Sequence, residues 1–132
     1  MTVMAKNIEH PDELRKLPND SGEGSVVNVG AMTVIRGELR PGWRWSNDVR
    51  PTAGTASCEF EHTGIVLDGR LHVEMDDGTS RDLGPGDVYI IPPGHDAWVV
   101  GDEPYHSIDW ASGNKEFGKP AAGSGVNDDN TN

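Results

Sequence analysis

Three side chains that bind soft or borderline metal ions lie within one stretch of the chain. Cys58 and His62 are four residues apart, and His95 follows the turn sequence Pro-Pro-Gly further along. A thiolate and two imidazoles suit zinc, and catalytic zinc keeps three protein ligands and one open position. The pattern therefore predicts a divalent metal centre at Cys58, His62 and His95, with zinc, iron, nickel and manganese as the candidate ions.

The spacing of Cys58 and His62 sets a condition on this hypothesis. On one straight strand, residues four apart are separated by roughly 13 Å, so the two can share an ion only if the chain turns or bulges within 59–61. The alternative is a buried structural cysteine, a hydrogen-bonded histidine and an exposed turn histidine at position 95. In the metal hypothesis, Asp96 could orient a ring nitrogen of a ligand.

The other histidines have simpler interpretations. His72 alternates with apolar neighbours and is expected on the outer face of a strand. His106 is in step with Ile108 and Trp110, which predicts a buried core histidine, with a fourth metal ligand as the alternative. His10 is expected to mark the start of a first helix.

Aromatic and basic residues suggest a ligand pocket. Trp43, Trp45 and Trp98 could wall an apolar pocket, or they could simply fill the core of a small domain. An arginine could pair with a ligand carboxylate, or it could form an ordinary surface ion pair; Arg36 is the candidate for the pocket, beside Arg44 and Arg50.

These residues must be positioned by short strands. Asp-Gly and Gly-Pro-Gly turns separate apolar runs at 64–67 and 88–91, and Asp-Gly between such runs is a strong hairpin signal. Further strands are predicted at 25–29, 31–39 and 105–111, and the segment 46–57 as a long polar connection. Pro11 opens a predicted short helix over 11–17. We expect an arm over 1–24, a β domain over 25–111 and a flexible tail over 112–132.

Composition limits the class of protein. The 132 residues include 17 glycines and 9 prolines, which favours an all-β sandwich or barrel with a single core. The formal net charge of −11 argues against nucleic acid and anionic membranes as partners. No apolar run approaches the roughly 20 residues of a membrane span. One cysteine excludes an internal disulfide, and we expect a cytoplasmic protein.

Two motifs resemble the cupin superfamily. They are Val66-Leu-Asp-Gly69, and Gly86-Asp-Val followed by Pro92-Pro-Gly94. The resemblance covers roughly residues 31–110 and implies an all-β, cupin-type jelly-roll β-barrel. Cupins commonly dimerise through outer strands, so the resemblance also implies a homodimer.

The resemblance places the family's metal positions on unusual residues. His62 stands where the family usually has a glutamate, and Cys58 stands where it has a histidine. The histidine of the second motif falls on Ala97, with His95 two residues earlier. A second alignment, starting from Gly42, makes Asp48 a further candidate ligand.

The sequence supports three functional hypotheses. The first is a small-molecule-binding cupin with a divalent metal in the barrel mouth, and with dioxygenase, isomerase or lyase chemistry if it is an enzyme. The second is a metal-free ligand-binding or sensory cupin. The third is a barrel that serves only as an interaction module.

Overall fold

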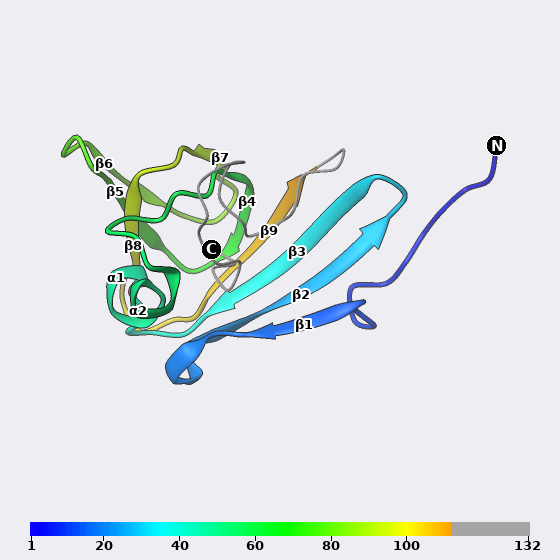
Figure 1. Ribbon diagram of the computed structural model, residues 1–132. Helices are drawn as coiled ribbons and strands as arrows, with labels where there is room; N and C mark the ends of the chain where they lie inside the picture. The colour runs from blue at the N-terminus through cyan, green and yellow to red at the C-terminus, as the bar shows by residue number, and fades with distance from the viewer. Residues whose placement is uncertain (112–132) are drawn as a thin grey trace.

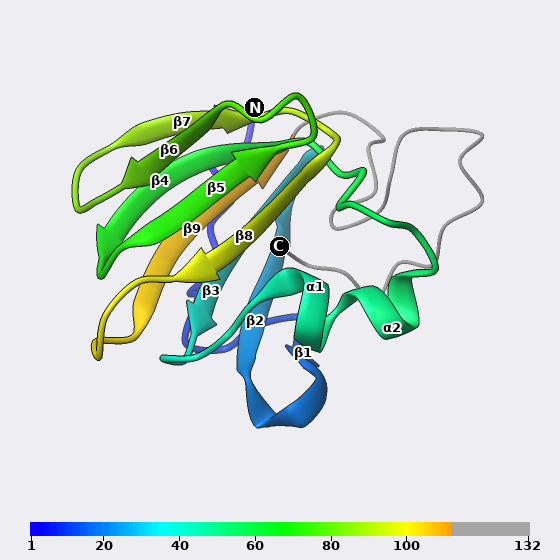
Figure 2. The same ribbon diagram turned by 90° about the vertical axis from the view of Figure 1, so that its left-hand side faces the viewer.

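The computed structural model describes residues 1–111, and these form two antiparallel sheets packed face to face (Figures 1 and 2). The larger sheet has six strands in the order β1-β2-β3-β9-β4-β7, and the smaller has three in the order β6-β5-β8. The strands are β1 (Glu13–Lys16), β2 (Gly22–Val29), β3 (Met32–Leu39), β4 (His62–Asp68), β5 (Leu71–Met75), β6 (Ser80–Leu83), β7 (Val88–Ile91), β8 (His95–Val99) and β9 (Tyr105–Ala111). The all-β prediction is confirmed. The predicted tail, 112–132, lies outside the described residues.

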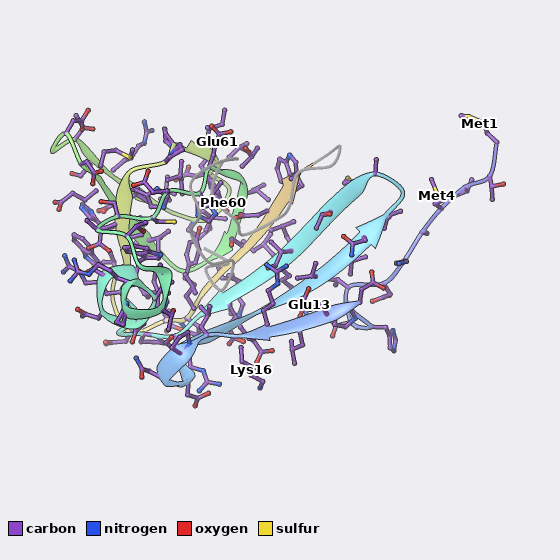
Figure 3. All side chains as sticks on the ribbon, in the orientation of Figure 1. Met1, Met4, Glu13, Lys16, Phe60 and Glu61 are labelled. Carbon is purple, nitrogen blue, oxygen red and sulfur yellow. The ribbon has the colours of Figure 1, made fainter. Side chains whose placement is uncertain are left out.

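The predicted helix over 11–17 is wrong. Glu13–Lys16 form β1, which pairs antiparallel with β2, with Glu13 opposite Val26 and Lys16 opposite Glu23. A seven-residue helix is marginal by itself, whereas the edge of β2 offers a ready row of backbone hydrogen-bonding groups. A 3₁₀-helix follows at Pro18–Asp20. Figure 3 shows Glu13 and Lys16 on the far side of the molecule from Phe60 and Glu61, which lead into β4.

Two short helices occupy the segment predicted as a polar connection. They are α1 (Trp45–Asp48) and α2 (Arg50–Ala53), and they lie at one end of the sandwich, where α1 packs against β8 (Figure 2). This segment contributes three buried side chains to the core: Trp45, Val49 and Ala53. These apolar residues recur at helical spacing, which explains why the segment folds as helices. No helix among residues 1–111 is long and apolar enough to cross a bilayer.

The core fills the space between the sheets. In β3, Ile35 and Leu39 point inward, whereas Arg36 and Glu38 point outward. In β9 the inward residues are Tyr105, Ser107 and Asp109. The predicted phase of this last strand is therefore wrong: His106 is half-buried on the outer face, with Nε2 3.6 Å from Glu38 Oε2, and Trp110 is exposed.

Apolar side chains also lie on the outside of the six-stranded sheet. Val88 and Ile90 of β7 are 70% and 69% exposed, and Trp110 of β9 lies exposed on the same sheet. Exposed apolar side chains grouped on one sheet face are common at interaction sites. The homodimer stays a prediction.

Candidate metal centre

The structure brings Cys58, His62 and His95 together. One ligand atom from each lies within 4.8 Å of the other two. All three side chains are inaccessible to solvent, with exposed fractions of 0%, 3% and 2%. The alternative of an exposed turn histidine at position 95 is therefore wrong, because His95 is buried.

The required turn between Cys58 and His62 is a crossing between the two sheets. Cys58 forms an antiparallel bridge with His95 at the edge of the small sheet, through Cys58 N–H to His95 O at 2.7 Å and Gly94 N–H to Cys58 O at 2.7 Å. Residues 59–61 then cross to the large sheet, where His62 opens β4 opposite Ile91. The two side chains face one another across the layers, and Cys58 Sγ lies 3.8 Å from His62 Nε2.

Each histidine has one ring nitrogen occupied by an acceptor. His62 Nδ1 lies 3.1 Å from Asp109 Oδ2, and His95 Nδ1 lies 2.7 Å from the carbonyl oxygen of Pro92. An acceptor at Nδ1 fixes a proton there, so Nε2 is the nitrogen that each ring can offer to a metal. Both Nε2 atoms can serve as ligands beside the Cys58 sulfur, and metal binding by His62 releases the proton on its Nε2.

Asp109 and Tyr89 belong to the candidate site and were not predicted from the sequence. Asp109 is 1% exposed, and its Oδ1 accepts a hydrogen bond from the Tyr89 hydroxyl while its Oδ2 faces His62. Burial and the nearby Asp109 charge both raise the pKa of Tyr89, so the phenol stays protonated and donates. The inward polar positions of β9 were the available signal, but Ile108 and Trp110 favoured the opposite phase.

Electrostatics at the cluster favour a thiolate. Burial by itself raises the pKa of Cys58, but hydrogen bonds and charge from His62 and His95 outweigh it and lower the pKa to about 6. Burial lowers the pKa of His62, but hydrogen bonds to Asp109 and Cys58 outweigh it and raise the pKa to about 9. The thiolate, rather than the thiol, is the form that binds metal.

The donor set fits a divalent transition metal. In a tetrahedral zinc site, a sulfur and a nitrogen ligand are separated by about 3.6 Å, close to the 3.8 Å between Cys58 Sγ and His62 Nε2. A cavity of about 20 Å³, lined in part by Trp43, His62, His95 and Asp109, adjoins the two histidines. The indole N–H of Trp43 is buried there without a hydrogen-bond acceptor among the described residues. That volume holds about one water molecule.

The remaining predicted site residues lie elsewhere. Asp48 is in α1, where its carboxylate accepts from Asn19 Nδ2 at 3.0 Å and from the Arg44 backbone N–H at 2.9 Å. Arg36 points outward and pairs with Glu9 at 2.6 Å. Trp45 is fully buried in the core, away from the cavity lining.

Trp98 lies on the outer face of the small sheet. Its ring is stacked on the Arg44 guanidinium, 4.1 Å from the ring centroid, and on the His72 ring at 4.4 Å. His72 pairs with Asp82 and is half-buried, as expected for an outer-face residue. Of the residues predicted for the pocket, only Trp43 lines the cavity.

Comparison with known proteins gives a family and a fold. A family model described as a cupin domain matches residues 54–110. A sugar phosphate isomerase of the cupin superfamily from Silicibacter pomeroyi is 18% identical, with a TM-score of 0.59 over 82% of this chain and 74% of that chain. KdgF from a Halomonas species is 18% identical, with a TM-score of 0.58 over 88% of this chain and 97% of that one. The polyketide cyclase RemF from Streptomyces resistomycificus is 18% identical, with a TM-score of 0.58 over 84% and 80%. No curated protein sequence matches significantly.

Proposed function

We propose that this chain, whose residues 54–110 match a cupin domain, is a cupin that binds a divalent transition metal through Cys58, His62 and His95 and acts on a small organic molecule. One observation carries the proposal. Asp109 and Pro92 occupy Nδ1 of His62 and His95, so Nε2 of each ring is the nitrogen left to bind an ion beside the Cys58 sulfur, with release of the proton on His62 Nε2. When bound, such an ion would polarise a substrate oxygen as a Lewis acid or activate water or oxygen.

The surrounding residues hold the ligands ready. Asp109 keeps the proton of His62 on Nδ1 and orients the ring, and Tyr89 in turn fixes the Asp109 carboxylate. The short bridge to Cys58 places His95 at the start of β8. Trp43, Leu39 and Tyr105 are among the other residues that line the cavity and exclude bulk water, which strengthens electrostatic interactions at the site.

Replacing Asp109 by asparagine tests this arrangement. We expect the affinity of metal-stripped protein for Zn²⁺, measured by competition with a chromophoric chelator, to fall by about 10- to 100-fold, because the ligand His62 loses its orienting carboxylate. Asp82→Asn is the matched control, because Asp82 pairs with His72 on the outer face, and it should leave the affinity unchanged. Equal affinities for wild type and Asp109→Asn, or no saturable uptake by wild type, would contradict the proposal.

A metal-free ligand-binding cupin is the second candidate. It is favoured by the continuous chain of contacts from Cys58 through His62 to Asp109, with Cys58 Sγ 3.8 Å from His62 Nε2 and His62 Nδ1 3.1 Å from Asp109 Oδ2. Thiolate, imidazolium and carboxylate would then satisfy one another in the core. In that case the zinc titration shows no uptake, while small-molecule binding remains.

A further inference from the structure

A groove of about 450 Å³ opens between β6 and β7, the adjacent edges of the two sheets. One turn, residues 84–87, joins the two strands. In this turn the Asp87 N–H donates to Gly84 O at 3.0 Å, and the Gly84 N–H donates to Asp87 Oδ2 at 2.8 Å. No backbone hydrogen bond joins β6 to β7 in the described part of the chain. The groove has the volume of a small-molecule site, and we call it the β6–β7 groove.

The β6–β7 groove adjoins the metal centre. Tyr89 and Ile91 line both the groove and the 20 Å³ cavity. Ile91 pairs in register with His62, and Pro92, also at the groove, accepts the hydrogen bond from His95 Nδ1. One layer of side chains thus separates groove from metal ligands. Since the cavity holds about one water molecule, an organic molecule needs the groove for its body.

The groove carries an unpaired positive charge. Arg81 is opposite the buried Val73 in the β5–β6 pair and two residues before the buried Leu83, so strand alternation places it on the inward face. It is exposed and has no ion-pair partner among residues 1–111. The other charged residue of the groove lining, Asp87, has its Oδ2 held by the Gly84 N–H. In a chain with a net charge of −11, a free arginine on an apolar wall favours an anion. The apolar wall is formed by Val73, Met75, Leu83, Ile91 and Pro92.

We propose that the β6–β7 groove binds a small organic carboxylate, with its apolar body on this wall and its carboxylate paired to Arg81. The claim that this carboxylate is the substrate of the metal centre rests on the proposed function. The binding itself depends only on the groove residues, so the two can be tested separately.

The test uses 2-naphthoate as probe, titrated into the full chain and followed by naphthalene fluorescence and by backbone amide NMR shifts. Wild type should bind it saturably, with shifts in β6 and β7. Arg81→Gln should weaken binding by about tenfold or more, and Arg81→Lys should restore part of it. Arg70→Gln is the matched control, since Arg70 is another arginine without an ion pair among residues 1–111 but lies outside the groove.

An uncharged analogue and metal-stripped wild type separate the outcomes. Naphthalene-2-carboxamide should bind wild type and Arg81→Gln equally weakly, because it has no charge for Arg81 to recognise. Wild type kept metal-free by a strong chelator should still bind 2-naphthoate, which supports the groove even if the metal proposal fails. Equal 2-naphthoate affinity in wild type and Arg81→Gln, or saturable metal uptake without any 2-naphthoate binding, would overturn the groove proposal. In that event, Arg81 would only protect an edge strand from pairing.

Discussion

Replacing His62 by alanine should lower the free energy of unfolding of the metal-free protein by about 3–5 kcal/mol. His62 and Asp109 are 3% and 1% exposed, so removing the imidazole leaves the Asp109 carboxylate buried, with the Tyr89 hydroxyl still donating to it. An uncompensated buried charge costs far more than a lost surface contact. Urea unfolding in the presence of a strong chelator measures the change without a contribution from bound metal.

Two further variants identify the cause. His72→Ala removes a histidine that also pairs with a carboxylate, but at a partly exposed position, and should cost within about 1 kcal/mol. Adding Asp109→Asn to His62→Ala should recover part of the loss, because the stranded charge is removed. A His62→Ala protein as stable as His72→Ala, or a double variant less stable than His62→Ala, would show that the buried pair is not the source of stability.

Replacing Gly64 by alanine should destabilise the protein by about 3 kcal/mol and weaken metal binding as well. A Cβ at this position would lie 2.7 Å from the Tyr89 hydroxyl and would clash still more closely with the Ile108 carbonyl oxygen and Asp109 Oδ1. The carbonyl belongs to the neighbouring strand β9 and cannot rotate away. The clash therefore pushes Asp109 from its place behind His62.

Gly84→Ala is the matched glycine control. Its added Cβ would meet Nη1 of Arg70 at 3.1 Å, the flexible end of a long side chain that can move. Thermal unfolding and chelator competition on both variants give stability and zinc affinity. Similar losses in Gly64→Ala and Gly84→Ala, or a Gly64→Ala variant with undiminished affinity, would contradict the role of Gly64 as the space for Asp109.

Turn chemistry explains why the barrel could be predicted from the sequence. The Asp-Gly and Gly-Pro-Gly turns each contain a glycine with a positive φ, between 81° and 91°: Gly69, Gly78 and Gly86. Such turns are encoded by residues adjacent in the chain, so the sequence identifies them directly. The helix over 11–17 failed for the opposite reason. Its competitor, the edge of β2, is distant in sequence and supplies hydrogen bonds that local propensity does not include.

The candidate site was only partly predictable. Residue type selected Cys58, His62 and His95, and the condition that the chain must turn between the first two holds, because residues 59–61 cross between sheets. Asp109 was missed because β9 carries large apolar side chains on its outer face, so that alternation alone favours the wrong phase. Arg36 lies outside the cavity because it alternates with the buried Ile35 and faces away from the core.

Metal content per chain tests the central claim most directly. The protein should be purified without a metal-affinity tag, and its metal measured by elemental analysis as isolated and after exposure to Zn²⁺, Fe²⁺, Ni²⁺ or Mn²⁺ followed by desalting. We expect about one equivalent of one divalent ion per chain, lost in Cys58→Ser, in His62→Ala and in His95→Ala but kept in His72→Ala. A wild-type protein without metal in every preparation, or one whose metal survives all three ligand substitutions, would contradict it.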